Sequence, residues 1–136
     1  MARGHTILAL DVGEKRIGVA VADSNIRIAV PFETIEVDGN EIHAISKIIV
    51  TEYADTIVVG YPRNQAGETT AQTRYVESFA EKLTGLAPTI DFQDESLTSV
   101  IAEERLAVHK RPYSKGDIDA QAAAIILTDY LETHHV

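Results

Sequence analysis

The most constraining feature of the sequence is a pair of apolar runs near its start, separated by a short polar turn. Residues 7–12 read Ile-Leu-Ala-Leu-Asp-Val and residues 17–22 read Ile-Gly-Val-Ala-Val-Ala, with Gly13 to Arg16 between them. Two such runs joined by a turn predict the antiparallel strands of a hairpin. Because the side chains of a strand alternate between its faces, nearly continuous apolar runs also predict a sheet that is covered on both faces.

The rest of the chain alternates strand and helix signals, which predicts an α/β fold. We expect a mixed five-stranded sheet that begins with the antiparallel hairpin, continues with parallel strands and is flanked by helices. Pro31 confines the third strand to an edge or breaks it, because proline cannot donate to a ladder. After the hairpin, the expected elements are a strand within 26–37, a helix at about 41–54, a strand at 56–60, a helix at 70–84, a strand at 89–92, a helix at 99–109 and a last helix from Asp117 or Ile118.

Length and composition limit the class of protein. At 136 residues the chain is expected to form a single domain, 1–136, with a substantial core. The absence of cysteine excludes disulfides, thiolate metal sites and cysteine nucleophiles. The first apolar run is too short for a signal peptide or a membrane span, so we expect a cytoplasmic protein without a membrane partner.

The charge is strongly negative, with 21 acidic and 12 basic residues and a formal net charge of −9. This balance disfavours strong nonspecific attraction to a polyanion. Net charge does not describe local patches, however, and a basic rim around an acidic centre is compatible with it. The basic residues close to the expected loops are Lys15, Arg16, Arg63, Arg74, Lys110, Arg111 and Lys115.

Asp11 is the first candidate functional residue. It interrupts an otherwise apolar strand, where a carboxylate is costly to desolvate unless it has a partner. One interpretation is structural: Asp11 ends the strand and accepts hydrogen bonds from the turn at Gly13. The other is that Asp11 is a metal ligand.

Two further acidic sites lie at the ends of expected elements. Asp94 and Glu95 follow the fifth strand and precede a helix, a position that overlooks the edge of an α/β sheet but also suits an acid that complements the helix dipole. Asp117 looks like the N-cap of the last helix. Asp119 shares the inward helix face with Ile126 and is therefore the better ligand candidate.

Asp11, Glu95 and Asp119 together suggest a cation site. Hard oxygen ligands from three element ends suit Mg²⁺ or Mn²⁺, which support phosphate chemistry. With two ions, one would activate the attacking water and the other would stabilise the leaving oxygen of a phosphodiester. Acidic triads are common, so spacing alone makes this a hypothesis.

The order of motifs resembles that of the YqgF/RuvX family of Holliday-junction-resolvase-like proteins. The resemblance covers nearly the whole chain, and several separate motifs make it specific. The matching segments are Leu10 to Asp23, Val58 to Asn64 with Gly67, Gln72 to Ala80 with Leu83, Asp94 to Ser99 with Ala102 and Glu103, and Asp119 to Leu127.

The resemblance implies an RNase H-like fold and three metal-binding catalytic carboxylates, Asp11, Glu95 and Asp119. It implies a nuclease that matures the 5′ end of small-subunit (16S) ribosomal RNA, with Holliday-junction cleavage as the alternative. Structured RNA, or branched DNA, is the expected partner. The residues expected to contact that substrate are Lys15, Arg16, Arg63 and Asn64.

The sequence departs from the family pattern at two places. The family usually has arginine after the Asp-Glu pair, where this chain has Ser96, and this removes an implied phosphate contact. A common Gly-Leu-Pro-Leu-Asn pattern becomes Gly-Tyr-Pro-Arg-Asn at 60–64, which introduces a cation at Arg63.

Two other classes of function compete with a nuclease. The Asp11 turn also resembles the phosphate loop of actin-like ATPases and sugar kinases, but those proteins need a duplicated fold that this chain is too short to hold. A non-catalytic RNA-binding or transcription-associated factor would fit the negative charge and Ser96, whereas the intact acidic triad favours catalysis.

Overall fold

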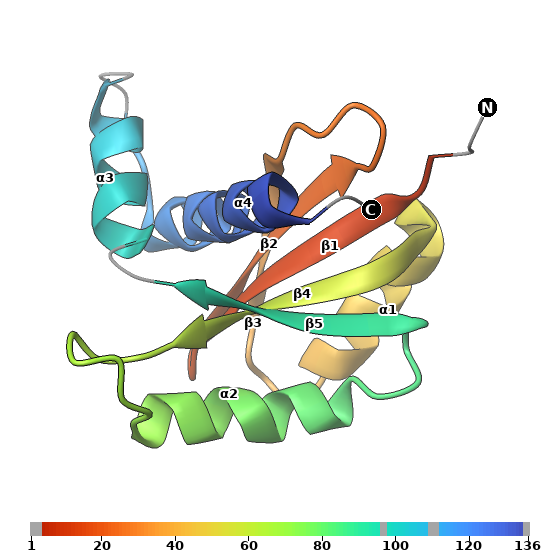
Figure 1. Ribbon diagram of the computed structural model, residues 1–136, viewed down its shortest axis with the longest axis horizontal. Coiled ribbons are helices and arrows are strands. Elements are labelled where there is room, and N and C mark those ends of the chain that lie inside the picture. The colour runs from red at the N-terminus through yellow and green to blue at the C-terminus, as the bar shows by residue number, and fades with distance from the viewer. Residues whose placement is uncertain (1–3, 96–97, 109–111, 135–136) are drawn as a thin grey trace.

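The structure is a computed structural model that describes residues 4–95, 98–108 and 112–134. Its centre is one five-stranded sheet in the order β3-β2-β1-β4-β5 (Figure 1). The hairpin strands β1 (Thr6–Val12) and β2 (Arg16–Asp23) are antiparallel, and β3 (Val30–Glu36) continues the antiparallel half. The strands β4 (Ala54–Pro62) and β5 (Thr89–Glu95) run parallel to β1, which confirms the expected mixed sheet.

Strand β3 lies at the sheet edge, as its proline predicted. Pro31 stands opposite Ala20, and the register between the two strands shifts between Val19 and Ala20. An edge strand tolerates the missing N–H of proline because the other side of that strand needs no ladder partner.

Helices cover both faces of the sheet (Figure 1). The helices α1 (Glu41–Glu52) and α2 (Ala71–Lys82) pack on one face. The long helix α4 (Lys115–Thr133) crosses the other face, and α3 (Thr98–Val108) packs against α4. No described helix is both long enough and apolar enough to cross a membrane.

Successive side chains of β1 point to opposite faces of the sheet and so belong to two different cores. Leu8 and Leu10 are fully buried in the core that includes the side chains of α1 and α2. Ile7 and Ala9 are fully buried in the second core, which α4 closes. Asp11 continues the second series, so its side chain lies on the α4 face.

Several boundaries differ from those expected. Strand β5 continues through Glu95, so the Asp-Glu pair belongs to the strand and does not follow it. Helix α4 begins at Lys115, and its N-cap is Ser114. Asp117 was expected to be the N-cap, and that prediction is wrong: its side chain instead accepts a hydrogen bond from the N–H of Ser114 at 2.9 Å, which completes a capping box.

Candidate active site

Asp11 lies between two glycines in a row across the sheet. Its partner on β2 is Gly18, and the register that pairs Leu10 with Val59 brings Gly60 of β4 to its other side. Neighbouring residues at one level of a sheet project to the same face. The two positions that flank Asp11 on the α4 face therefore carry no side chain, and other groups approach the sheet there.

Gly18 allows α4 to contact the sheet directly. A Cβ atom at this position would lie 1.9 Å from the carbonyl oxygen of Asp119 and 2.8 Å from the nitrogen of Ala120. Any side chain at Gly18 would therefore push α4 away. The close approach brings the helix turn that carries Asp119 onto the strand beside Asp11.

Gly60 allows the side chain of Glu95 to fold across the sheet. A Cβ atom here would lie 2.2 Å from Glu95 Oε2 and 2.6 Å from Ile126 Cδ1. The carboxylate of Glu95 thus occupies the space above β4, between its own edge strand and Asp11. Asp11, Glu95 and Asp119, which lie far apart in the sequence, meet at the same end of the sheet.

Asp11 interacts electrostatically with each of the other two carboxylates. Burial raises the pKa of Asp11 from 3.8 to about 7, and the nearby charge of Asp119 adds to the increase. Burial likewise raises the pKa of Glu95 from 4.5 to about 8, with a further contribution from Asp11. Without a cation, the site therefore holds protons at neutral pH that ordinary carboxylates would have lost.

Among the described residues, Asp119 is the member of the group that has a cationic partner. Arg16 Nε donates to Asp119 Oδ2 at 2.7 Å, and the two side chains are 29% and 23% exposed. Asp119 therefore points toward the sheet, as its helix position predicted, while Asp117 is engaged in the capping box. Arg16 was expected to contact substrate, and the structure places it against an acid of the candidate site.

The donor set fits a hard divalent cation. Glu95 Oε2 is buried and has no hydrogen-bond partner among the described residues, although a buried carboxylate oxygen normally has one. The available groups are carboxylates, which Mg²⁺ and Mn²⁺ prefer. Within the described residues, no three acidic or histidine side chains already form a metal-holding group. The side chains would have to adjust when an ion binds.

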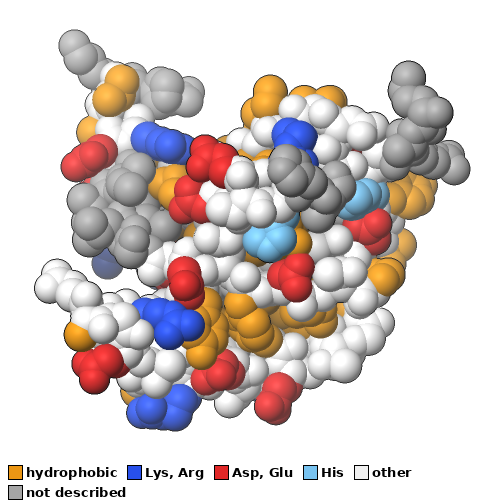
Figure 2. Space-filling model, in the orientation of Figure 1, with side chains coloured by type: hydrophobic (Ala, Val, Ile, Leu, Met, Phe, Trp, Pro, Cys, Tyr) orange, Lys and Arg blue, Asp and Glu red, His pale blue; other side chains and the backbone are white. Residues whose placement is uncertain are grey.

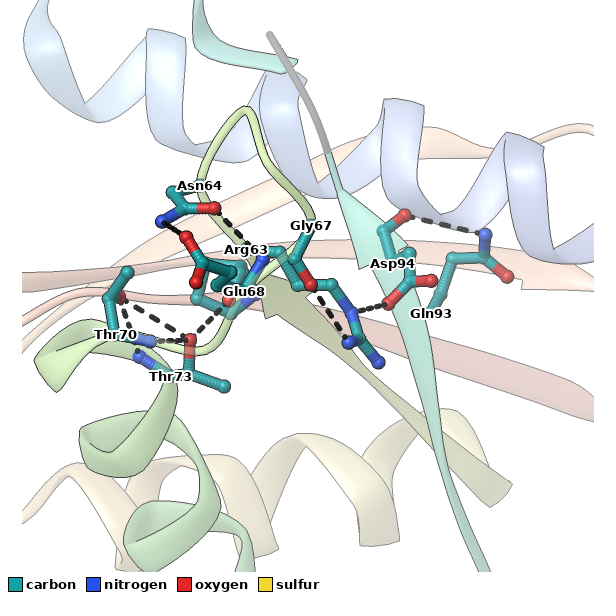
Figure 3. Close-up of polar contacts among 9 residues, drawn as sticks. Arg63, Asn64, Gly67, Glu68, Thr70, Thr73, Gln93 and Asp94 are labelled. Carbon is teal, nitrogen blue, oxygen red and sulfur yellow. Dashed lines mark hydrogen bonds and ion pairs between the residues drawn. The ribbon is translucent and has the colours of Figure 1, made fainter.

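The β4–α2 loop forms the rim of the site next to the end of β5 (Figure 3). Arg63 Nε donates to Asp94 Oδ1 at 3.0 Å, and its guanidinium lies 4.9 Å from the centre of the Tyr61 ring. Lys15 is exposed on the hairpin turn. Figure 2 shows acidic and basic side chains next to one another on this part of the surface.

Asn64, also expected to contact substrate, is used inside the same loop. Its side-chain oxygen accepts from the N–H groups of Ala66 and Glu68 at 3.0 and 2.9 Å, and its Nδ2 donates to Glu68 Oε1 at 3.2 Å (Figure 3). These contacts shape the rim that presents Arg63. Ser96 and the basic residues Lys110 and Arg111 lie outside the described residues.

Sequence reasoning missed the roles of the two glycines and the Arg16–Asp119 pair. A signal for the glycines was present, because an isolated glycine inside a strand often marks a place where other groups approach closely. No sequence signal identifies the ion pair, whose partners are 103 residues apart.

Comparison with solved structures identifies the fold. A Thermus thermophilus structure titled "RuvC in complex with Holliday junction substrate" matches with a TM-score of 0.56 at 14% identity, covering 93% of each chain. The yeast mitochondrial Holliday junction resolvase Ydc2 matches with a TM-score of 0.51 at 12% identity, covering 92% of this chain and 77% of that one. The chain shares the RNase H-like fold of these proteins.

Sequence comparison identifies the family. A Chloroflexus aurantiacus protein named "Putative pre-16S rRNA nuclease" is 43% identical over 93% of this chain and 86% of its own length. A Synechocystis protein of the same name is 39% identical over 97% and 90%. The family model described as "RuvX: Holliday junction resolvase" matches residues 5–133. The chain therefore belongs to the RuvX family, as its motif order indicated.

Proposed function

We propose that this protein is a metal-dependent nuclease that hydrolyses phosphodiester bonds in precursor 16S ribosomal RNA during 5′-end maturation. The observation that carries the proposal is the convergence of Asp11, Glu95 and Asp119 at one end of the sheet, where burial and mutual repulsion raise two pKa values. Such an arrangement is costly for a fold and is typical of a site that binds cations.

In this proposal Asp11, Glu95 and Asp119 hold Mg²⁺ or Mn²⁺. The bound metal would supply activation of water and stabilisation of the leaving oxygen. Asp11 is central, because it is fixed in the middle strand and interacts with both other acids. Because Gly18 and Gly60 carry no side chain, Asp119 and Glu95 can lie directly against the sheet beside Asp11.

Substrate would enter beside the end of β5, next to the β4–α2 loop. Lys15 on the hairpin turn and Arg63 on the β4–α2 loop would supply the positive charge that a phosphate backbone needs on an otherwise negative protein. Asn64 acts by shaping the loop that presents Arg63. Arg63 is also fixed by Gly67, whose carbonyl oxygen accepts from Nη1 at 3.3 Å.

The relatives favour RNA over branched DNA. Proteins that share about two fifths of the sequence are named as pre-16S rRNA nucleases, whereas the resolvase structures share only 12–14% identity. Action on precursor ribosomal RNA would place the protein in the cytoplasm. Branched DNA is the alternative substrate, because the family description names a Holliday junction resolvase.

The test is incubation of purified protein with 16S precursor RNA and with a four-way DNA junction, with Mg²⁺ or Mn²⁺ and with EDTA. We expect metal-dependent cleavage at the 5′ side of the precursor, and no cleavage by Asp11→Asn. Cleavage of the junction alone would identify a DNA resolvase. Tight RNA binding without cleavage under any metal condition would identify a non-catalytic RNA-binding factor.

A further inference from the structure

The ion pair between Arg16 and Asp119 gives the candidate site a cation of its own. The contact joins Arg16 Nε and Asp119 Oδ2 at 2.7 Å, and both side chains are mostly shielded from water. A short, shielded, charge-assisted hydrogen bond is stronger than an exposed pair. One of the two oxygens that Asp119 could offer to a metal is therefore already engaged.

The backbone around Arg16 is fixed. The carbonyl oxygen of Arg16 accepts from the N–H of Gly13 at 3.0 Å, which closes the hairpin turn, and Arg16 pairs with Glu36 on β3. Two residues further along β2, Gly18 lies directly against the backbone of Asp119. The backbones of both partners are thus held by β2 and α4, so the pair can separate only through movement of the two side chains.

A divalent ion and the guanidinium would compete for the same space. Both would lie beside the Asp119 carboxylate, and like charges at that separation repel strongly in a partly buried site. The described residues contain no ready-made metal-holding group of three acids. The pairing with Arg16 fits this finding, since one carboxylate oxygen of Asp119 is already engaged.

We propose that Arg16 is a built-in counter-ion that occupies the cation position at Asp119 when the site is empty, and that metal binding displaces it. This inference rests on the proposed function, because it takes Asp119 as a metal ligand. Arg16 is then a positioning residue. It keeps Asp119 oriented toward the site and neutralises one charge, and it lowers the affinity for metal by the free energy needed to break the pair.

Calorimetric titration of Mn²⁺ into the full chain tests the sign of this effect. Arg16→Gln keeps part of the aliphatic stem and removes the charge, so we expect roughly fivefold tighter Mn²⁺ binding. Lys15→Gln is the matched control, because it removes one positive charge from the same turn and Lys15 has no ion pair among the described residues. We expect it to change the affinity less than about twofold.

A second measurement uses the unaltered protein. In NMR spectra, the Nε–H signal of Arg16 should show a hydrogen-bonded state without metal and should lose it as Mg²⁺ saturates the site. Unchanged or weaker metal binding by Arg16→Gln, or a hydrogen-bonded signal that persists at saturation, would overturn the inference while leaving the metal site intact. Failure of the unaltered protein and of both variants to bind metal would overturn the proposed function as well.

Discussion

Replacing Asp11 with asparagine should stabilise the metal-free protein at alkaline pH. The folded state raises the pKa of Asp11 from 3.8 to about 7, because burial and Asp119 oppose its ionisation. A raised carboxyl pKa means that the folded state binds more protons than the unfolded state between these values. Its contribution to stability is therefore present at about pH 4 and is lost as pH rises to about 8.

The size of the effect follows from the shift. The change in the pKa of Asp11 corresponds to about 4 kcal/mol at 1.36 kcal/mol per unit. Burial is the larger cause of the shift, and the amide of an asparagine in the same place must also be desolvated, so only part of this free energy is recovered. We therefore expect Asp11→Asn to gain about 2 kcal/mol at pH 8, or roughly 7 °C in Tm.

The assay is thermal unfolding in EDTA at pH 5 and pH 8. At pH 5, about one unit above the unfolded pKa of Asp11, only about a third of the penalty applies, so the variant should gain roughly 3 °C there against roughly 7 °C at pH 8. Glu14→Gln is the control, since it removes an exposed acid from the same hairpin turn. A variant that melts well below the parent at pH 8 would show that the Asp11 carboxylate stabilises the fold, and the reasoning would be refuted.

Three further outcomes follow from the same geometry. Gly18→Ala should destabilise the protein by about 3 kcal/mol because its Cβ meets the Asp119 backbone, whereas Gly116→Ala should slightly stabilise it; chemical denaturation compares them. Gly60→Ala should displace Glu95 and clearly weaken Mn²⁺ binding while Tm falls only slightly. A large fall in Tm with unchanged Mn²⁺ binding would contradict this role. Mg²⁺ affinity should rise from pH 6 to pH 9, because the ion must displace protons; a flat calorimetric profile would contradict it.

Much of the fold could be predicted from the sequence because its signals are local. Each signal depends on nearby residues alone. Examples are the apolar runs of the hairpin, the proline of β3 and the apolar residues at helical spacing in α2. The boundaries were less accurate at β5 and α4. The strand continues to Glu95 through pairing with β4, and the capping box of Ser114 starts α4 before its apolar stripe begins.

The candidate site was predictable in part. Asp11 stood out because a carboxylate interrupts an apolar strand, and the inward position of Asp119 followed from helical spacing. The pairing of Asp119 with Arg16 could not be predicted, since it depends on how closely α4 approaches β2. That approach depends on Gly18, whose significance becomes clear only when the two elements are seen in contact.

The most direct test of the central claim is a crystal structure of the protein soaked with Mn²⁺, with the ion located by anomalous scattering. We expect a peak at the end of β1 with carboxylate oxygens of Asp11, Glu95 and Asp119 at about 2.2 Å. Arg16 should have left Asp119 in that structure. A peak elsewhere, or an ion bound without Asp11, would contradict the assignment of these three carboxylates as the catalytic centre.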